Sequence, residues 1–224
     1  MAYFRKNLAI DLGTTSIRIY TRSQGVILNE PSVVAIDVYT DKIIAIGQEA
    51  KDMLGRAPGN IEALKPINGG VVADYKAAEK MLRYFIKKAC GRTVFGPNVI
   101  MSVPSKATQV QKRAILQAVS DAGAHNISLI EAPLAAALGH GVDADDPSGD
   151  LVVDIGGGKL DVALISLGGI VLSKSSPIAG NEFDKAVSEY IRKKFGIIIG
   201  ERTAEEIKIR IGSSASDEME ETME

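Results

Sequence analysis

The chain has 224 residues, one cysteine (Cys90) and a nearly balanced formal charge of −2 at pH 7. This length is sufficient for a buried core in one large domain or two small ones. The charge balance, without a dense Lys/Arg stripe interleaved with aromatic residues, argues against a nucleic-acid partner. A single cysteine excludes an internal disulfide framework and suits the cytosol. Because no apolar run is long enough to span a bilayer, we expect a protein that is soluble or at most peripheral to a membrane.

The first predicted element is a strand–turn–strand over Asn7–Tyr20. An apolar strand leads to Asp11, and Ile17 and Ile19 continue with alternating spacing after the turn. The turn itself carries Gly13, Thr14, Thr15 and Ser16. Because glycine has no Cβ atom, backbone N–H groups at such a turn can approach an anion closely.

Short β-branched segments follow and predict three further strands over Val26–Leu28, Ser32–Val38 and Lys42–Ile46. Gln48–Leu54 has the pattern of a short helix. Glycine and proline residues interrupt Gly55–Pro66, which we interpret as an insertion with weak helical character.

Asp74 is predicted to cap a long amphipathic helix, in which apolar residues recur on one face and basic residues line the other. A basic face of this kind is usually just solvated. The loop Gly91–Pro97 that leaves this helix carries Val94 and Phe95 at its tip. An apolar tip beside basic residues suits an anionic membrane surface. The alternative is that Phe95 folds back onto the sheet.

A strand is predicted over Asn98–Val103, followed by a helix whose start is marked by Thr108 and Gln111. These two residues have the spacing of a capping box. The helix is expected to bury an apolar stripe consisting of Val110, Ile115, Ala118 and Val119.

The second part of the chain repeats the first hairpin. Leu151–Ser166 has the pattern of strand, glycine turn and strand, with Asp154 at the position of Asp11. The turn consists of Gly156, Gly157 and Gly158, followed by Lys159. Two copies indicate a duplicated α/β unit whose loops face one ligand. A carboxylate repels a phosphate unless a cation lies between them, so the two aspartates favour a nucleoside triphosphate with Mg²⁺.

Two helices are predicted after this hairpin. Asn181 is expected to cap Glu182–Phe195, whose apolar residues, among them Tyr190, are expected to form a core stripe. Thr203 and Glu206 are expected to form a capping box for the last helix.

These motifs also carry a family resemblance. Asp11–Thr15 and Val153–Gly158 are similar to the two phosphate-binding motifs of the actin and heat-shock-chaperone ATPase superfamily. Longer segments, Leu28–Ala35, Met81–Ile86 and Ile199–Ile209, resemble the MreB family of bacterial actins, which guide rod shape. The resemblance covers essentially the whole chain. It implies an α/β, actin-like (ribonuclease H-like) fold of duplicated domains with mixed sheets flanked by helices.

The resemblance also implies how the chain is divided. Residues 1–146 are expected to form the first actin-like half, with a small inserted subdomain at about 30–70. Residues 147–224 are expected to form a partial second half that ends inside its outer subdomain. Proteins of this family continue further, and that part completes the second half and supplies a glycine-rich adenosine contact.

ATP with Mg²⁺ is the cofactor that the resemblance implies, bound in a cleft between the halves. The phosphate loops would contribute Asp11, Gly13, Thr14, Thr15, Asp154, Gly156, Gly157, Gly158 and Lys159. Asp11 and Asp154 would hold the metal through water. On the family pattern, Glu205 and Lys208 would face the adenosine, and Val94 and Phe95 would dip into the membrane.

Two positions depart from the family pattern. Glu131-Ala132 stands where the family has Glu-Glu, and the second of those glutamates positions the attacking water. The methyl group of Ala132 cannot orient or deprotonate water, and Glu131 is expected to point elsewhere. Lys159 replaces a threonine; it either reaches the terminal phosphate as a fixed cation or lies in solvent with its stem along the sheet. We therefore expect slow or absent hydrolysis and assign no catalytic residue.

The expected function, taken from the resemblance, is that of a cell-shape-determining filament protein. Its cytoplasmic subunits would bind ATP, stack head to tail at the inner face of the cell membrane and organise the cell-wall synthesis machinery. One alternative is a hydrolysis-deficient or truncated paralogue that does not polymerise. A less favoured alternative is a small-molecule kinase of the same superfamily, which would need an acidic base facing a sugar pocket.

Overall fold

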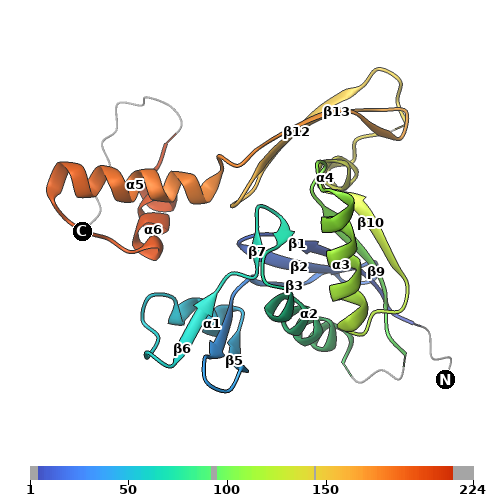
Figure 1. Cartoon of the computed structure of the whole chain (residues 1–224). Helices are drawn as coiled ribbons and strands as arrows, with labels where there is room; N and C mark the ends of the chain where they lie inside the picture. Colours follow the sequence, from blue (N-terminus) through green and yellow to red (C-terminus); the bar gives the residue numbers. More distant parts are fainter. Residues whose placement is uncertain (1–4, 92–94, 144, 214–224) are drawn as a thin grey trace.

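The computed structural model describes residues 5–91, 95–143 and 145–213. The largest sheet lies in the first part of the chain (Figure 1). Its strand order is β10-β9-β1-β2-β3. The strands are β1 (Asn7–Leu12), β2 (Ser16–Thr21), β3 (Gly25–Pro31), β9 (Asn98–Val103) and β10 (Ile127–Glu131). β1, β2 and β3 form an antiparallel meander, whereas β9 runs parallel to β1 and β10 parallel to β9. The first predicted hairpin is therefore confirmed.

Two amphipathic helices, α2 (Tyr75–Cys90) and α3 (Gln109–Asp121), cover one face of this sheet and bury the main core. The capping predictions at their N-termini are confirmed: Ala77 N–H donates to Asp74 at 2.9 Å, and Thr108 and Gln111 form a reciprocal capping box. The predicted burial of Val110 is wrong. This residue lies in the first turn of α3 and is exposed, so the buried stripe begins only at Ile115, in the second turn.

A smaller sheet of order β5-β4-β6 projects from the first sheet. Its elements are β4 (Val34–Asp37), β5 (Lys42–Ile46), β6 (Ile61–Leu64) and the short helix α1 (Gln48–Met53). The predicted helical character of Gly55–Pro66 is wrong, because Ile61–Leu64 pairs with the free edge of β4 and packs beside a cluster of small apolar residues. A two-stranded hairpin of β7 (Ile67–Asn68) and β8 (Val71–Val72) leads into α2.

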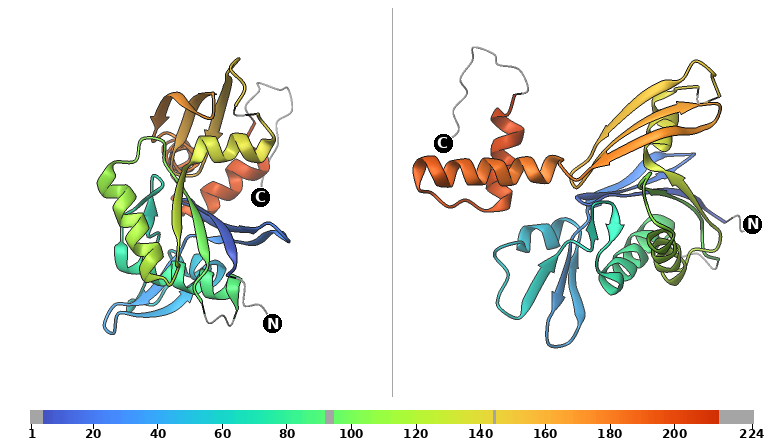
Figure 2. Two further views of the ribbon diagram at one scale, coloured as in Figure 1. Left: turned by 90° about the vertical axis from the view of Figure 1, so that its right-hand side faces the viewer. Right: turned by 45° about the horizontal axis from the view of Figure 1, so that its top comes forward.

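A second meander forms a three-stranded sheet of β11 (Asp150–Ile155), β12 (Leu160–Ser166) and β13 (Gly169–Ser176). Its register repeats that of the first sheet: Val153 pairs with Val162 as Ile10 pairs with Ile19. The helix α4 (Ala132–His140) contacts strands of both sheets. The first lobe consists of the first sheet, its helices and the smaller sheet (Figure 2). The second lobe consists of β11–β13 and the helices that come after them in the chain.

Within the described residues, β13 is followed by two helices, α5 (Gly180–Phe195) and α6 (Glu201–Ile211), which pack on each other. Both predicted caps are wrong, since Ala179 and Gly200 are the N-cap residues and use no side chain. At α5 the reason is local: the N–H groups of Gly180 and Asn181 donate to carbonyls of the glycine turn. The predicted core stripe of α5 is also wrong, because no residue of this helix is fully buried and Tyr190 is exposed. Across residues 5–91, 95–143 and 145–213, every helix is too short or too polar to span a lipid bilayer.

Candidate functional site

The two hairpins end in the same turn. Gly13 N–H donates to the Ser16 carbonyl at 3.0 Å, and Gly156 N–H donates to the Lys159 carbonyl at 2.9 Å. In each copy an aspartate stands two residues before the glycine, near the end of a strand. The duplication inferred from sequence spacing therefore extends to individual backbone hydrogen bonds.

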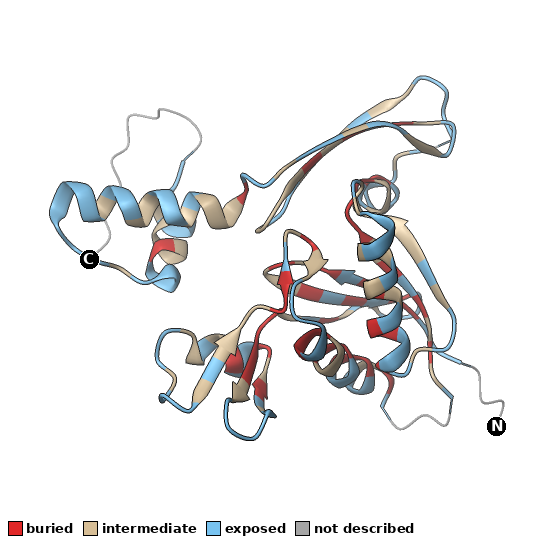
Figure 3. Cartoon of the chain, in the orientation of Figure 1, coloured by how far each residue is buried: buried red, intermediate tan, exposed pale blue. Residues whose placement is uncertain are grey.

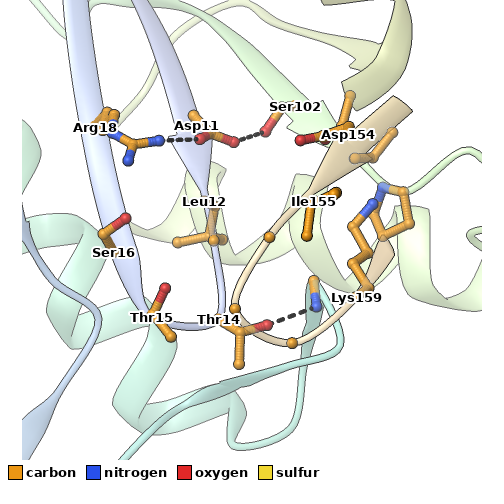
Figure 4. Close-up of a pocket in the computed structure, with 18 residues that line it drawn as sticks. Asp11, Leu12, Thr14, Thr15, Ser16, Arg18, Ser102, Asp154, Ile155 and Lys159 are labelled. Carbon is orange, nitrogen blue, oxygen red and sulfur yellow. Dashed lines mark hydrogen bonds and ion pairs between the residues drawn. The ribbon is translucent and has the colours of Figure 1, made fainter. Parts of the chain in front are cut away.

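Asp11 is held by side chains of the two strands that flank β1. Ser102 on β9 donates its hydroxyl to the carboxylate at 2.7 Å, and Arg18 on β2 lies 3.6 Å from the other carboxylate oxygen. The carboxylate remains about half exposed (Figure 4). One neutral donor and one loosely paired cation fix the orientation of Asp11 while leaving its oxygens accessible to a ligand.

Asp154 is the corresponding residue of the second sheet, and it points toward the same space as Asp11 (Figure 4). Burial raises the pKa of Asp154, and the nearby carboxylates of Asp11 and Asp161 raise it further, while Lys159 and Arg18 oppose the increase. A carboxylate whose charge is unfavourable in its folded surroundings gains from the arrival of a cation. The two aspartates therefore favour a positively charged ligand between them.

A cleft of about 230 Å³ lies between the lobes and collects the predicted phosphate-loop residues. Its lining consists of Asp11, Leu12, Gly13, Thr14, Thr15, Ser16, Arg18, Gly70, Ser102, Val103, Pro104, Ala132, Asp154, Ile155, Gly156, Gly157, Gly158 and Lys159. All nine residues predicted for the phosphate loops are among them. Carboxylates, hydroxyls, cations and glycine N–H groups thus converge on one space from both halves of the repeat.

At the floor of the cleft the two loops touch. A Cβ atom placed on Gly157 would lie 2.7 Å from Thr15 Oγ1, and one on Gly158 would lie 2.7 Å from Thr14 Cβ. Thr14 is itself buried and accepts a hydrogen bond from Gly70 N–H at 3.1 Å. Gly157 and Gly158 are therefore required by the close approach of the first loop, which is a steric reason for their presence in addition to any contact with an anion.

Lys159 takes a position that neither sequence-based alternative describes. Its amine pairs with the fully buried carboxylate of Asp161, which also accepts a hydrogen bond from Ser175. Its stem packs near Gly70, where a Cβ atom would lie 3.0 Å from Lys159 Cε. A buried carboxylate requires a partner of this kind, so Lys159 serves as the counter-ion of Asp161 in this conformation.

Ala132 lines the cleft at the start of α4. The adjacent Glu131 is not part of the lining and instead lies 3.5 Å from Lys112 on α3. The position that holds the water-directing glutamate in the family pattern therefore carries a methyl group that faces the site, and the neighbouring carboxylate is engaged elsewhere.

Glu205 and Lys208, predicted to face adenosine, lie outside the lining of this cleft. Glu205 pairs with Lys51 on α1 at 2.9 Å, which joins the second lobe to the first. Lys208 donates to the Gly180 carbonyl at 3.1 Å and pairs with Asp184 at 2.7 Å, both within the second lobe. Both side chains thus have partners within the chain itself.

The predicted membrane tip is described only in part. Val94 lies outside the described residues. Phe95 is about half exposed, with the guanidinium carbon of Arg5 5.6 Å from its ring centroid. Its ring is therefore accessible and lies beside a cation.

Several lining residues were not predicted, notably Arg18, Ser102 and Gly70. Arg18 could have been found from the repeat, because it occupies the position that Asp161 holds in the second copy. Ser102 and Gly70 could not have been found from the repeat, because they approach the site from elements outside the duplicated hairpin.

Solved structures with a similar fold identify the class. The chain matches MreB5 of Spiroplasma citri bound to ADP with a TM-score of 0.92 and 37 % identity, over 99 % of this chain and 67 % of that one. A MamK double helical filament matches with a TM-score of 0.77 over 93 % of this chain and 65 % of that one, and at 20 % identity this likeness concerns the fold alone. The fold is that of the actin-like proteins, as the sequence predicted.

Sequence comparisons identify the family. The MreB/Mbl protein profile matches residues 5–224. The cell shape-determining protein MreB of Escherichia coli (strain K12) is 48 % identical over 225 residues, which is 97 % of this chain and 65 % of MreB. The cell shape-determining protein Mbl of Bacillus cereus is 44 % identical over 222 residues, 97 % of this chain and 67 % of Mbl. The chain belongs to the MreB/Mbl family and spans about two thirds of the length of these relatives.

Proposed function

We propose that this protein binds ATP with Mg²⁺ in the cleft between its two lobes and acts as a subunit of a cell-shape-determining filament. The observation that carries the proposal is the meeting of two matched hairpins, which bring Asp11 and Asp154 to one cleft. The glycine turns beside them offer backbone N–H groups of the kind that bind phosphate. The relatives named above, which include a protein solved with ADP, support this ligand class.

The donors in the cleft fit magnesium. Mg²⁺ usually binds through one or two carboxylates and completes its shell with water and phosphate oxygens. Among the described residues there is no group of three or more His, Cys, Asp and Glu side chains that could enclose a metal. Asp11 and Asp154 would therefore hold Mg²⁺ together with a phosphate ligand, and the ion would supply charge neutralisation between carboxylates and phosphates.

The size of the cleft suggests that nucleotide entry requires the lobes to part. Its volume of about 230 Å³ lies below the roughly 300–1,000 Å³ of typical small-molecule sites. It accommodates phosphate and metal near the loops, whereas a whole nucleotide needs more room. Since the loops already touch at Thr14 and Gly158, opening has to occur toward the mouth of the cleft.

Calorimetric titration of the chain with ATP in Mg²⁺ and in EDTA tests the nucleotide site. Replacing either carboxylate, Asp11→Asn or Asp154→Asn, should weaken Mg²⁺-dependent binding about tenfold or more, since a hydrogen bond or contact to a charged group contributes about 1.5–3 kcal/mol. Asp41→Asn is the matched control, because this exposed carboxylate pairs with Lys80 away from the cleft. Equal affinity in all four proteins would refute the proposed site.

Hydrolysis should be slow. Ala132 faces the cleft with a methyl group, and the described residues that line the cleft include no glutamate or glutamine. General-base or water-positioning groups typically contribute 10²–10⁴-fold to such a reaction. Single-turnover phosphate release should therefore increase in Ala132→Glu, and a rate in the unmodified chain equal to that of E. coli MreB would contradict this expectation.

Filament formation and membrane attachment complete the proposal. The relatives are named cell shape-determining proteins, and MamK, which shares the fold, forms a filament. We place the subunits in the cytoplasm, stacked head to tail in a filament. Phe95 and Arg5 would attach the filament to the inner face of the membrane, where it would organise cell-wall synthesis. ATP-dependent sedimentation tests assembly. Co-sedimentation with anionic vesicles, compared between the unmodified chain and Phe95→Ser, tests attachment.

A further inference from the structure

Lys159 is a cation held in one position at the end of the second glycine turn. It lines the cleft, and its side chain is only 18 % exposed. The ammonium group pairs with Asp161, and the stem packs on the first lobe, where a Cβ atom on Gly70 would lie 3.0 Å from Lys159 Cε. A lysine in free solvent loses rotamer entropy when it binds an anion. The folded chain has already removed much of that entropy from Lys159 before a ligand arrives.

The carboxylate that holds Lys159 is itself anchored. Asp161 is fully buried and accepts a hydrogen bond from the Ser175 hydroxyl on β13. In β11–β13, which the structure describes in full, Asp161 shares this burial only with Ala163 and Ile165 (Figure 3). Burying a carboxylate costs free energy unless a cation and hydrogen bonds replace its hydration. Asp161 therefore keeps the ammonium group of Lys159 at this one position.

Strand alternation places this ion pair on the same face as the candidate metal ligand of the second lobe. Lys159 directly precedes β12 and lies two residues before Asp161, which pairs across the strands with Asp154. Residues two apart on a strand, and residues directly opposite each other, project from the same face of a sheet. An ammonium group has three N–H donors. Lys159 can therefore remain paired with Asp161 and still donate to a phosphate oxygen beside Asp154.

Each lobe thus supplies one cation beside one aspartate. In the first lobe Arg18 lies opposite Asp11 in the strand pairing, with 3.6 Å between their charged groups. On the other side of the cleft, Lys159 is close enough to Asp154 to oppose the raised pKa of that carboxyl (Figure 4). These four are the charged side chains among the described residues that line the cleft, so the lining is formally neutral. The threonine of the family pattern at position 159 would leave one uncompensated negative charge, which repels phosphate until a divalent ion arrives.

We propose that Lys159 is a specificity-determining residue of the nucleotide cleft and lets it accept metal-free ATP as well as ATP with Mg²⁺. The inference rests on the nucleotide site proposed above. The fixed ammonium group and the N–H groups of the glycine turns would give the phosphates charge-assisted hydrogen bonds in the absence of a divalent ion. Mg²⁺ held by Asp11 and Asp154 would then add affinity without being required for binding.

The experiment compares the Kd for ATP in EDTA with the Kd in Mg²⁺ by calorimetric titration. In the unmodified chain the two values should differ by less than about tenfold, since Lys159 already supplies one charged contact to phosphate. Lys159→Thr should bind ATP in EDTA about tenfold or more weakly than the unmodified chain, because that contact is lost. The loss should be smaller in Mg²⁺. Lys174→Thr is the matched control, because Lys174 is an exposed lysine of β13 outside the cleft lining.

A double variant guards against poor folding, since Lys159→Thr alone leaves the carboxylate of Asp161 buried without its cation. Lys159→Thr with Asp161→Asn replaces the ion pair by neutral groups and should show the same weak binding in EDTA. Equal affinity of this double variant and the unmodified chain in EDTA would overturn the inference. So would an unmodified chain that binds ATP in Mg²⁺ but not in EDTA, and that result would leave the proposed ATP site intact. Absence of binding under both conditions would overturn both proposals.

Discussion

Among the residues that the structure describes, three ion pairs connect α6 of the second lobe to the outer part of the first lobe. Glu205 lies 2.9 Å from Lys51, Glu201 lies 2.9 Å from Lys65, and Arg202 lies 3.6 Å from Asp52. Because these pairs bridge the two lobes, separating the lobes requires breaking them. We therefore predict that charge neutralisation in α6 shifts the molecule toward an open state and that high salt has the same effect.

The free energy that each ion pair contributes follows from how exposed its two side chains are. Pairs between exposed side chains contribute about 0.2–1 kcal/mol each. Lys51–Glu205 is the least exposed of the three, so we place it near 1 kcal/mol, and the other two near the lower end. Glu205→Gln should then increase the open population about fivefold, and neutralising all three pairs about tenfold, since 1.4 kcal/mol is a factor of ten.

Single-molecule energy transfer between the lobes measures this population. Dyes placed at Thr40→Cys and Lys193→Cys would report the distance, because both residues are exposed and the native Cys90 is buried with a raised pKa of its thiol. Glu206→Gln is the control, since Glu206 pairs with Arg210 inside α6. The difference between Glu205→Gln and the unmodified chain should vanish near 1 M salt, where screening acts over about 3 Å. Identical distance distributions at low salt would refute the role of these pairs.

Three further predictions concern stability. Gly158→Ala should cost about 1–3 kcal/mol in urea unfolding because its methyl group meets Thr14, whereas Gly59→Ala, with open space around it, should cost far less. Asp154→Asn should raise the melting temperature of the ligand-free chain at neutral pH. The half-buried carboxylate has a raised pKa, so its stability contribution falls as pH rises through that pKa, and the gain should disappear in acid, where Asp154 is protonated in both states. Thr108→Ala should lose about 1 kcal/mol with the capping box of α3, measured by urea unfolding.

The parts of the fold that could be predicted from sequence are those fixed by local patterns. The two hairpins followed from alternating apolar residues around Asp11 and Asp154, and the starts of α2 and α3 from side-chain caps. These signals succeed because the interactions that decide them lie within a few residues of one another. The repeated hairpins predicted a duplicated α/β unit, and the resemblance of their motifs to a known superfamily implied the actin-like architecture.

The errors arose where distant contacts decide the structure. The start of α5 is set by the carbonyls of the glycine turn, so the capping potential of Asn181 is not used. Strand β6 forms because β4 offers it an edge, which no local pattern reveals. At the candidate site, the pairing of Lys159 with Asp161 depends on Asp161 being fully buried, a property of the folded sheet.

Helix α4 has a mechanical consequence for the whole molecule. It contacts β9 and β10 of one sheet and β11 and β12 of the other, so a change in the angle between the sheets must slide strands across it. Alanine supplies four of its residues, Ala132, Ala135, Ala136 and Ala137, and these short side chains do not interlock deeply with a neighbour. Such a surface permits shear without repacking of long side chains. A larger side chain at the buried Ala137 would have to displace Val152 and Ile165 of the second sheet, against which this alanine packs.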